Sequence, residues 1–249
     1  MKNVQIFQSI NATIAQQNAT SFLEKCLIEN KSKEILLLLS GGSAFSLLNI
    51  DIKILTDKMT IGVLDERYST DPNINNFQQL VATPFFLKAQ RAGCRFIDTS
   101  VKPNETIAEL ALCFERELKN WKNNNPNGII IITQGMGADG HTSGIMPFPE
   151  NKDLFATLFE NETKWVAGYD AGNRNQFPQR VTTTIPFLRN VDISLVYIVG
   201  KEKVEIVKKA LKEDVSSNVL PICIIKKIKS VYLFTDITEM DEGCSSAKL

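Results

Sequence analysis

The chain has 249 residues, of which 43% are hydrophobic and 22% charged, and 28 basic residues balance 28 acidic ones. This composition is typical of a globular protein with a sizeable core, and the zero net charge gives no global attraction to nucleic acid or to an anionic membrane. Five cysteines without a Cys-x-x-Cys pair, beside a single histidine, argue against a structural zinc site, so we expect no metal. Without a signal peptide or a membrane-spanning run, the scattered cysteines indicate a cytoplasmic protein.

The first half of the chain predicts strands that alternate with helices. Apolar runs indicate strands at 3–7, 34–40, 59–64 and 95–98. Apolar residues at helical spacing predict helices over 10–30 and 104–122, and shorter ones after Ala44 and after Asn76, which we expect to be the cap. Pro84 interrupts the last of these patterns, so that helix should be short or broken.

The second half repeats the alternation. Strands are predicted at 128–133, 164–169, 180–185, 192–199 and 230–234, a helical turn or two at 153–159, and a helix that ends at Leu211. Residues 171–179 are polar and contain glycine, which predicts a loop; 222–225 are ambiguous, and the last dozen residues are expected to be a frayed tail. The whole pattern predicts an α/β fold: a mostly parallel, doubly wound sheet with helices on both faces. No linker divides it, so we expect a single domain over 1–249.

Two short motifs follow directly after apolar strands, where open α/β sheets bind their ligands. Gly41, Gly42 and Ser43 could present backbone N–H groups to a phosphate, or form an ordinary turn in which Ser43 caps a helix. Asp65, Glu66 and Arg67 could contact a ligand, or form a solvated loop. Neither motif decides between its two interpretations alone.

The most informative stretch is the loop from Thr133 to Pro147, which follows four consecutive isoleucines and contains His141, the only histidine. A side chain that titrates near neutrality at the end of a buried strand is a candidate for chemistry. The loop also matches the dinucleotide pattern G-x-G-x-x-G. We reject that interpretation because Asp139 would face a pyrophosphate, and because Pro147 and Pro149 leave little room for the crossover helix that would bind it.

Five segments, in this order, resemble the 6-phosphogluconolactonases within the larger group that includes the glucosamine-6-phosphate deaminases. The segments are Ser40-Gly-Gly-Ser43, Asp65-Glu-Arg67 with Asn76, Gly135-Met-Gly-Ala-Asp-Gly-His-Thr142 with Met146-Pro147, Pro178-Gln-Arg-Val-Thr182, and Gly200-Lys-Glu-Lys203. The resemblance implies a sugar-phosphate isomerase-like fold and hydrolysis of 6-phosphoglucono-δ-lactone in the oxidative pentose phosphate pathway, with a small-molecule substrate and no cofactor.

The resemblance also implies roles for individual residues. Asp139 and His141 take the positions of the acid/base pair, and Arg67 the position that faces the reacting end of the substrate. The residues expected to bind the substrate and its phosphate are Gly41, Gly42, Ser43, Asp65, Arg180 and Lys203. The chemistry agrees, because one histidine can activate water and later protonate the departing ring oxygen, and a guanidinium can stabilise the tetrahedral oxyanion.

Two other functions stay open. The deaminases carry a glutamate seven residues after the loop aspartate, and this chain has Met146 there, which cannot relay a proton. The chain also departs from the family at Ala44-Phe45, at Asn75-Asn76 and at Ser143-Gly-Ile-Met-Pro147, so a non-catalytic sugar-phosphate-binding protein is the second alternative. The sequence is compatible with a monomer or a weak homodimer.

Overall fold

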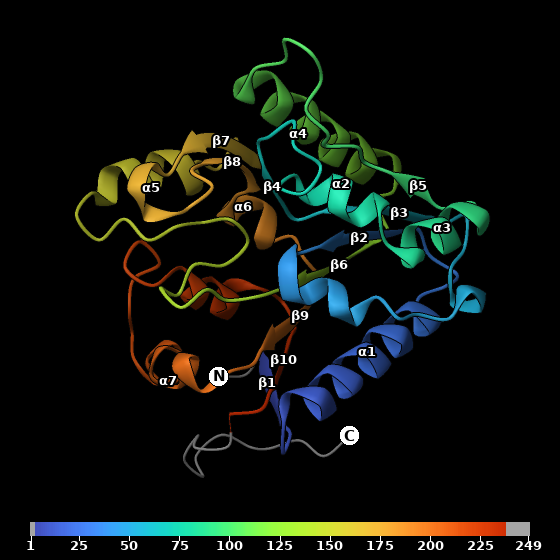
Figure 1. The fold of residues 1–249 in the computed structure, drawn as a ribbon, viewed down its shortest axis with the longest axis horizontal. Coiled ribbons are helices and arrows are strands. Elements are labelled where there is room, and N and C mark those ends of the chain that lie inside the picture. The colour runs from blue at the N-terminus through green and yellow to red at the C-terminus, as the bar shows by residue number, and fades with distance from the viewer. Residues whose placement is uncertain (1–2, 238–249) are drawn as a thin grey trace.

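The computed structural model describes residues 3–237, so the predicted tail lies outside the described residues. Its centre is a seven-stranded sheet in which every pairing is parallel (Figure 1). In spatial order the strands are β1 (Val4–Gln8), β10 (Val231–Thr235), β9 (Ile193–Ile198), β6 (Ile129–Gln134), β2 (Ile35–Leu39), β3 (Met59–Val63) and β5 (Arg95–Phe96). The parallel, doubly wound sheet predicted from the sequence is therefore confirmed.

The strand order reverses between β2 and β6, the two central strands. From β2 the chain continues to β3 and β5 on one side, whereas from β6 it continues to β9 and β10 on the other. The crevice outside the carboxyl ends of two such strands is where open α/β sheets bind ligands. Gly41 follows β2 and the loop with His141 follows β6, so both candidate motifs meet at this crevice.

Each face of the sheet carries a hydrophobic core because neighbouring residues of a strand point to opposite faces. Leu36 and Leu38 enter one core, and Ile35, Leu37 and Leu39 enter the other. Helix α4 (Ile107–Asn124) contributes to the first core, as do α5 (Lys152–Phe159), α6 (Ile185–Leu188) and α7 (Val204–Lys212). Helices α1 (Ala12–Glu29), α2 (Asn76–Val81) and α3 (Pro84–Arg91) contribute to the second. Figure 1 shows α1 and α4 on opposite sides of the central strands.

A second sheet, which the sequence did not predict, packs beside the first core. It is antiparallel, in the order β4 (Asp65–Arg67), β8 (Gln179–Thr183) and β7 (Val166–Asp170). The three charged residues Asp65–Arg67, for which a solvated loop was one interpretation, form its edge strand, and Asp65 and Glu66 are buried. That interpretation was wrong because a short charged strand carries no hydrophobic pattern.

Smaller differences concern helix ends. The segment after Gly41 is a 3-10 helix, Gly42–Leu47, and the ambiguous residues 222–225 lie in another, Pro221–Lys227. Asn75 rather than Asn76 caps α2, since its side chain accepts from the backbone N–H of Gln78. Pro84 begins α3, which confirms the expected break. Between residues 3 and 237, none of the helices has both the length and the apolar character needed to cross a membrane.

Candidate active site

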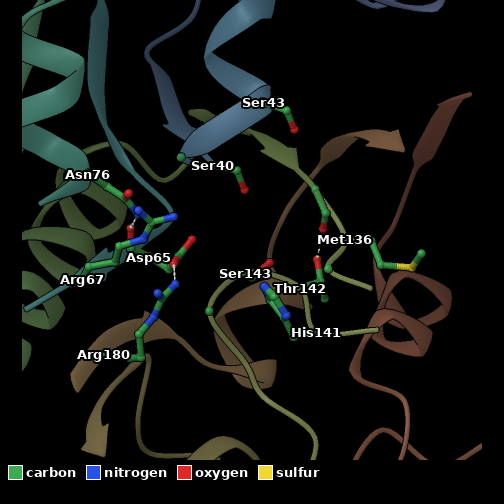
Figure 2. A pocket seen from close by; sticks show the side chains of 14 residues that line it. Ser40, Ser43, Asp65, Arg67, Asn76, Met136, His141, Thr142, Ser143 and Arg180 are labelled. Carbon is green, nitrogen blue, oxygen red and sulfur yellow. Dashed lines mark hydrogen bonds and ion pairs between the residues drawn. The ribbon is translucent and has the colours of Figure 1, made fainter. Parts of the chain in front are cut away.

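A cavity of about 150 Å³ lies at the carboxyl ends of β2 and β6. It is lined by Ser40, Gly41, Ser43, Asp65, Arg67, Asn76, Gly135, Met136, Gly137, His141, Thr142, Ser143, Gly144 and Arg180. Figure 2 shows two groups of side chains: the guanidinium groups of Arg67 and Arg180 near Asp65, and His141 with Thr142 on the other side. Segments that are far apart in the sequence therefore form one polar site.

The first wall comes from the turn after β2. Gly41 packs so closely on Asn76 that a Cβ atom at residue 41 would lie 2.5 Å from Oδ1 of Asn76, a contact that only glycine avoids. The amide of Asn76 donates to the carbonyl oxygen of Asp65 at 2.9 Å, and its Oδ1 is buried without a partner within residues 3–237. Asn76 therefore joins the turn after β2 to strand β4.

Two arginines stand side by side because of the register of the second sheet. Arg67 on β4 is paired with Arg180 on β8. Arg180 forms an ion pair with Asp65, and the two side chains are only 6% and 7% exposed. A buried ion pair of this kind leaves Arg180 neutralised. Asp65 is thus bound to a cation rather than free to contact an anionic ligand.

Arg67 has no such partner. Within residues 3–237 its guanidinium makes no hydrogen bond or ion pair, and its Nε is buried without a partner. Burial and, next, the positive charge of Arg180 lower the pKa of Arg67 from its ordinary value. An arginine remains charged in proteins even so. Arg67 therefore brings to the wall of the cavity a positive charge that has no ion-pair partner within residues 3–237.

His141 is held by Asp139. Its Nδ1 lies 2.5 Å from Oδ1 of Asp139, and its backbone N–H donates to the same oxygen at 3.1 Å. An ionised carboxylate only accepts, so in the neutral imidazole Nδ1 is the donor and Nε2 carries the lone pair. Burial raises the pKa of Asp139, but the hydrogen bonds and charge of His141 outweigh it, and the net pKa is lowered. The pair therefore presents a histidine in one defined tautomer.

The turn Ser143–Met146 closes the far end of the loop. Gly144 has φ +69° and approaches Asp65 so closely that a Cβ would lie 2.7 Å from the Cβ of Asp65. The hydroxyl of Tyr169 donates to the carbonyl oxygen of Gly144 at 2.6 Å and accepts from the backbone N–H of Met146 at 3.3 Å. Met146 is itself fully buried in the core and does not line the cavity.

Six of the nine residues singled out from the sequence line the cavity: Gly41, Ser43, Asp65, Arg67, His141 and Arg180. Asp139 contacts His141 from behind, and Gly42 lies between two lining residues. Lys203 is at the end of a 3-10 helix, Lys201–Lys203, and is not among the lining residues. Asn76, Ser40, Met136 and Thr142 lie in the segments that carry the family resemblance, but no role in the site was predicted for them or for Ser143.

The structure also bears on two rejected sites. The first helix after the glycine loop, α5, begins only at Lys152, so the loop does not lead directly into the helix N-terminus that dinucleotide binding requires. In the described part of the chain, no three side chains of the types His, Cys, Asp or Glu gather where they could bind a metal ion.

Comparisons with known proteins agree with this geometry. Residues 9–233 match the family model described as glucosamine-6-phosphate isomerases/6-phosphogluconolactonase. A 6-phosphogluconolactonase of Bos taurus is 26% identical over 232 residues, which cover 88% of this chain and 83% of that protein. A probable 6-phosphogluconolactonase of Dictyostelium discoideum is 25% identical over 189 residues, 73% of each chain.

Solved structures share the fold. A 6-phosphogluconolactonase from Plasmodium vivax superimposes with a TM-score of 0.72 at 18% identity, covering 94% of this chain and 91% of the other. A monomeric glucosamine-6-phosphate deaminase superimposes almost as well, with a TM-score of 0.71 at 17% identity and coverage of 96% and 100%. The fold alone therefore does not separate the two activities.

Proposed function

The chain belongs to the glucosamine-6-phosphate isomerase/6-phosphogluconolactonase family, and we propose that it hydrolyses 6-phosphoglucono-δ-lactone to 6-phosphogluconate. The observation that carries the proposal is the Asp139–His141 pair at the edge of a cavity that is also lined by Arg67, an arginine without an ion-pair partner in residues 3–237. This chain matches the 6-phosphogluconolactonase of Bos taurus over 83% of that protein and the probable 6-phosphogluconolactonase of Dictyostelium discoideum over 73%. This activity would give the protein a step in the oxidative pentose phosphate pathway.

In the proposed reaction, Nε2 of His141 takes a proton from water as the water oxygen attacks the lactone carbonyl carbon. The carbonyl becomes a tetrahedral oxyanion, which the charge of Arg67 stabilises. When the ring C–O bond breaks, His141 returns the proton to the ring oxygen, which becomes a hydroxyl group. Asp139 keeps the imidazole in the required tautomer throughout, and no covalent enzyme intermediate is needed.

We assign phosphate and substrate binding to Gly41, Gly42, Ser43, Arg180 and, from outside the lining, Lys203. The backbone of the turn after β2 supplies N–H groups suited to a phosphate. Because Arg180 forms an ion pair with Asp65, Arg180 adds no free positive charge to the site. We therefore propose that Arg180 binds substrate as part of a neutral pair beside Arg67. Asp65 is accordingly proposed to act on the substrate only through Arg180.

Deamination of glucosamine 6-phosphate is the second candidate, because a monomeric deaminase shares the fold. The position where that branch carries its glutamate is Met146, whose side chain is fully buried and away from the cavity. No carboxylate other than Asp65 lines the cavity in residues 3–237, and Asp65 is paired with Arg180. The site therefore favours ester hydrolysis.

The test is a parallel assay of the wild-type protein on both substrates. Acid release from freshly made 6-phosphogluconolactone, above the spontaneous rate, is the expected result, with no ammonia released from glucosamine 6-phosphate. Release of ammonia without lactone hydrolysis would identify a deaminase instead. Binding of 6-phosphogluconate with neither reaction would identify a sugar-phosphate-binding protein.

A further inference from the structure

The orientation of Arg67 needs an explanation, because no hydrogen bond or ion pair from the described residues fixes its guanidinium. Its neighbour Arg180 is held by Asp65. An aromatic ring lies against the guanidinium: the Cζ of Arg67 is 4.6 Å from the ring centroid of Phe177. A cation at this distance over an aromatic face is attracted by the ring quadrupole.

The side chain of Arg67 borders two cavities, so it could turn toward either of them. A second cavity of about 240 Å³ lies beside the candidate active site, and Arg67 lines both. Phe177 lines only the second cavity, together with Tyr68, Ile74 and Asp170. A long side chain between two cavities has several rotamers open to it, and fixing one of them costs entropy. The contact with the ring of Phe177 favours the rotamer in which Arg67 lines the active-site cavity as well as the second one.

Phe177 is itself fastened to the loop that carries His141. Its backbone N–H donates to Oδ1 of Asn175 at 3.0 Å, and the amide of Asn175 contacts Sδ of Met146 at 3.9 Å. The carbonyl oxygen of Pro178, the next residue, accepts from the backbone N–H of Ala171 at 2.8 Å. The backbone that carries the ring is therefore tied to the loop of His141 through Asn175 and to the end of β7 through Ala171.

We propose that Phe177 is a positioning residue: its ring holds the guanidinium of Arg67 at the wall of the active-site cavity, ready for the anionic substrate. The inference rests on the proposed function, because it assigns Phe177 a part in that reaction through Arg67. The proposal gives a residue of segment 171–179, which the sequence predicts only as a polar loop, a specific role in the site.

The experiment is a double-mutant cycle on lactone hydrolysis between Phe177→Leu and Arg67→Met. Leucine keeps an apolar side chain but has no aromatic face, and methionine keeps a long side chain but has no charge, so each variant removes the cation–π contact. Phe177→Leu should lower kcat/KM about two- to fivefold, as expected for a partly exposed cation–π contact, and Phe177→Tyr should keep wild-type activity. In the Arg67→Met background, Phe177→Leu should have almost no further effect.

Phe86→Leu is the matched control, because Phe86 is a half-buried phenylalanine of α3 that lines neither cavity. It should leave kcat/KM unchanged. Three results would overturn the proposal. Phe177→Leu could lower kcat/KM equally in both backgrounds, Phe177→Tyr could lower it as much as Phe177→Leu does, or Phe177→Leu could leave it unchanged. If the wild-type protein proved inactive on the lactone, the proposed function would be overturned. The same cycle would then be measured on the binding of 6-phosphogluconate by calorimetry, which tests the role of Phe177 independently of lactone hydrolysis.

Discussion

His141 is oriented by one carboxylate oxygen, which accepts from both its ring and its backbone. This arrangement explains why the two residues lie two positions apart: the spacing lets Asp139 shape the turn and hold the imidazole at once. The charge balance of the site is equally local. Asp65 neutralises Arg180, Asp139 accompanies His141, and Arg67 is left as the charge available to a phosphorylated substrate.

Replacing Asp139 with asparagine tests that orientation. The amide offers Nδ1 of His141 no strong acceptor and favours the wrong tautomer, so kcat should fall by about 10²- to 10⁴-fold. KM should change little, because Asp139 lies behind His141 and is not a lining residue. Steady-state kinetics of lactone hydrolysis gives both constants. A kcat close to that of the wild type would mean that Asp139 only shapes the turn.

At the scale of elements, a buried carboxylate ties α2 to the site. Glu66 is fully buried and accepts from the backbone N–H groups of Arg67, Asn76 and Phe77 and from the hydroxyl of Thr99. It thus fixes the N-terminus of α2, whose first residue, Asn76, enters the cavity wall. Burial raises the pKa of Glu66 to about 7 and outweighs these hydrogen bonds, which act in the opposite direction.

The raised pKa predicts a pH dependence of stability. Below about pH 4.5 Glu66 is protonated in both states; between 4.5 and 7 the unfolded chain loses the proton and the folded protein keeps it. The contribution of Glu66 to the free energy of unfolding therefore falls as pH rises through 7, by about 3 kcal/mol in total. Glu66→Gln has no such titration.

Urea denaturation of the wild type and Glu66→Gln at a series of pH values measures this contribution. Between pH 4.5 and 8, the free energy of unfolding of the wild type should fall relative to that of Glu66→Gln. Two parallel curves would mean that Glu66 is ionised in the folded protein over the whole range.

The central elements follow from the sequence because they are encoded locally. Four isoleucines before Thr133 and four leucines before Ser40 predict the two buried strands of the switch point, and the glycine motifs after them predict where a ligand binds. The second sheet is different. Strand β4 is three charged residues whose partner, β8, lies more than 110 positions away, so neither hydrophobic pattern nor turn chemistry identifies the pair.

The site shows the same division. His141, Arg67 and Gly41 stand out in the sequence by type and by position after a strand. The ion pair of Asp65 with Arg180 and the stacking of Phe177 on Arg67 depend on the register of β4 with β8 and on a distant loop. Asn76 belongs to one of the segments that carry the family resemblance, but its place in the cavity wall depends on the packing of Gly41 against it.

At the scale of the whole molecule, the central sheet joins the two cores. Strands β2 and β6 send alternate residues into each core, and the first strand, β1, pairs with the last, β10, along its whole length. Because both cores share these strands, loss of the sheet would disrupt both of them. The single-domain organisation, the cytoplasmic location, the monomeric or weakly dimeric state and the absence of a cofactor stay predictions.

A shared sheet predicts that the two cores unfold together. Both tryptophans, Trp121 and Trp165, belong to the core on the α4 face, whereas far-UV circular dichroism reports helices on both faces. In urea, the midpoints from tryptophan fluorescence and from circular dichroism should coincide. Two separate midpoints would mean that the chain contains two units that unfold independently.

His141 is the residue proposed to transfer the proton in the reaction. This role is tested most directly by kcat for 6-phosphogluconolactone hydrolysis, measured for the wild type, His141→Ala and His141→Asn. Asparagine can still donate to Asp139 but cannot carry a proton between water and the ring oxygen. Both variants should unfold at the same urea concentration as the wild type and lose kcat by about 10²- to 10⁴-fold. Lactone hydrolysis at near wild-type kcat in either folded variant would contradict the assignment of His141.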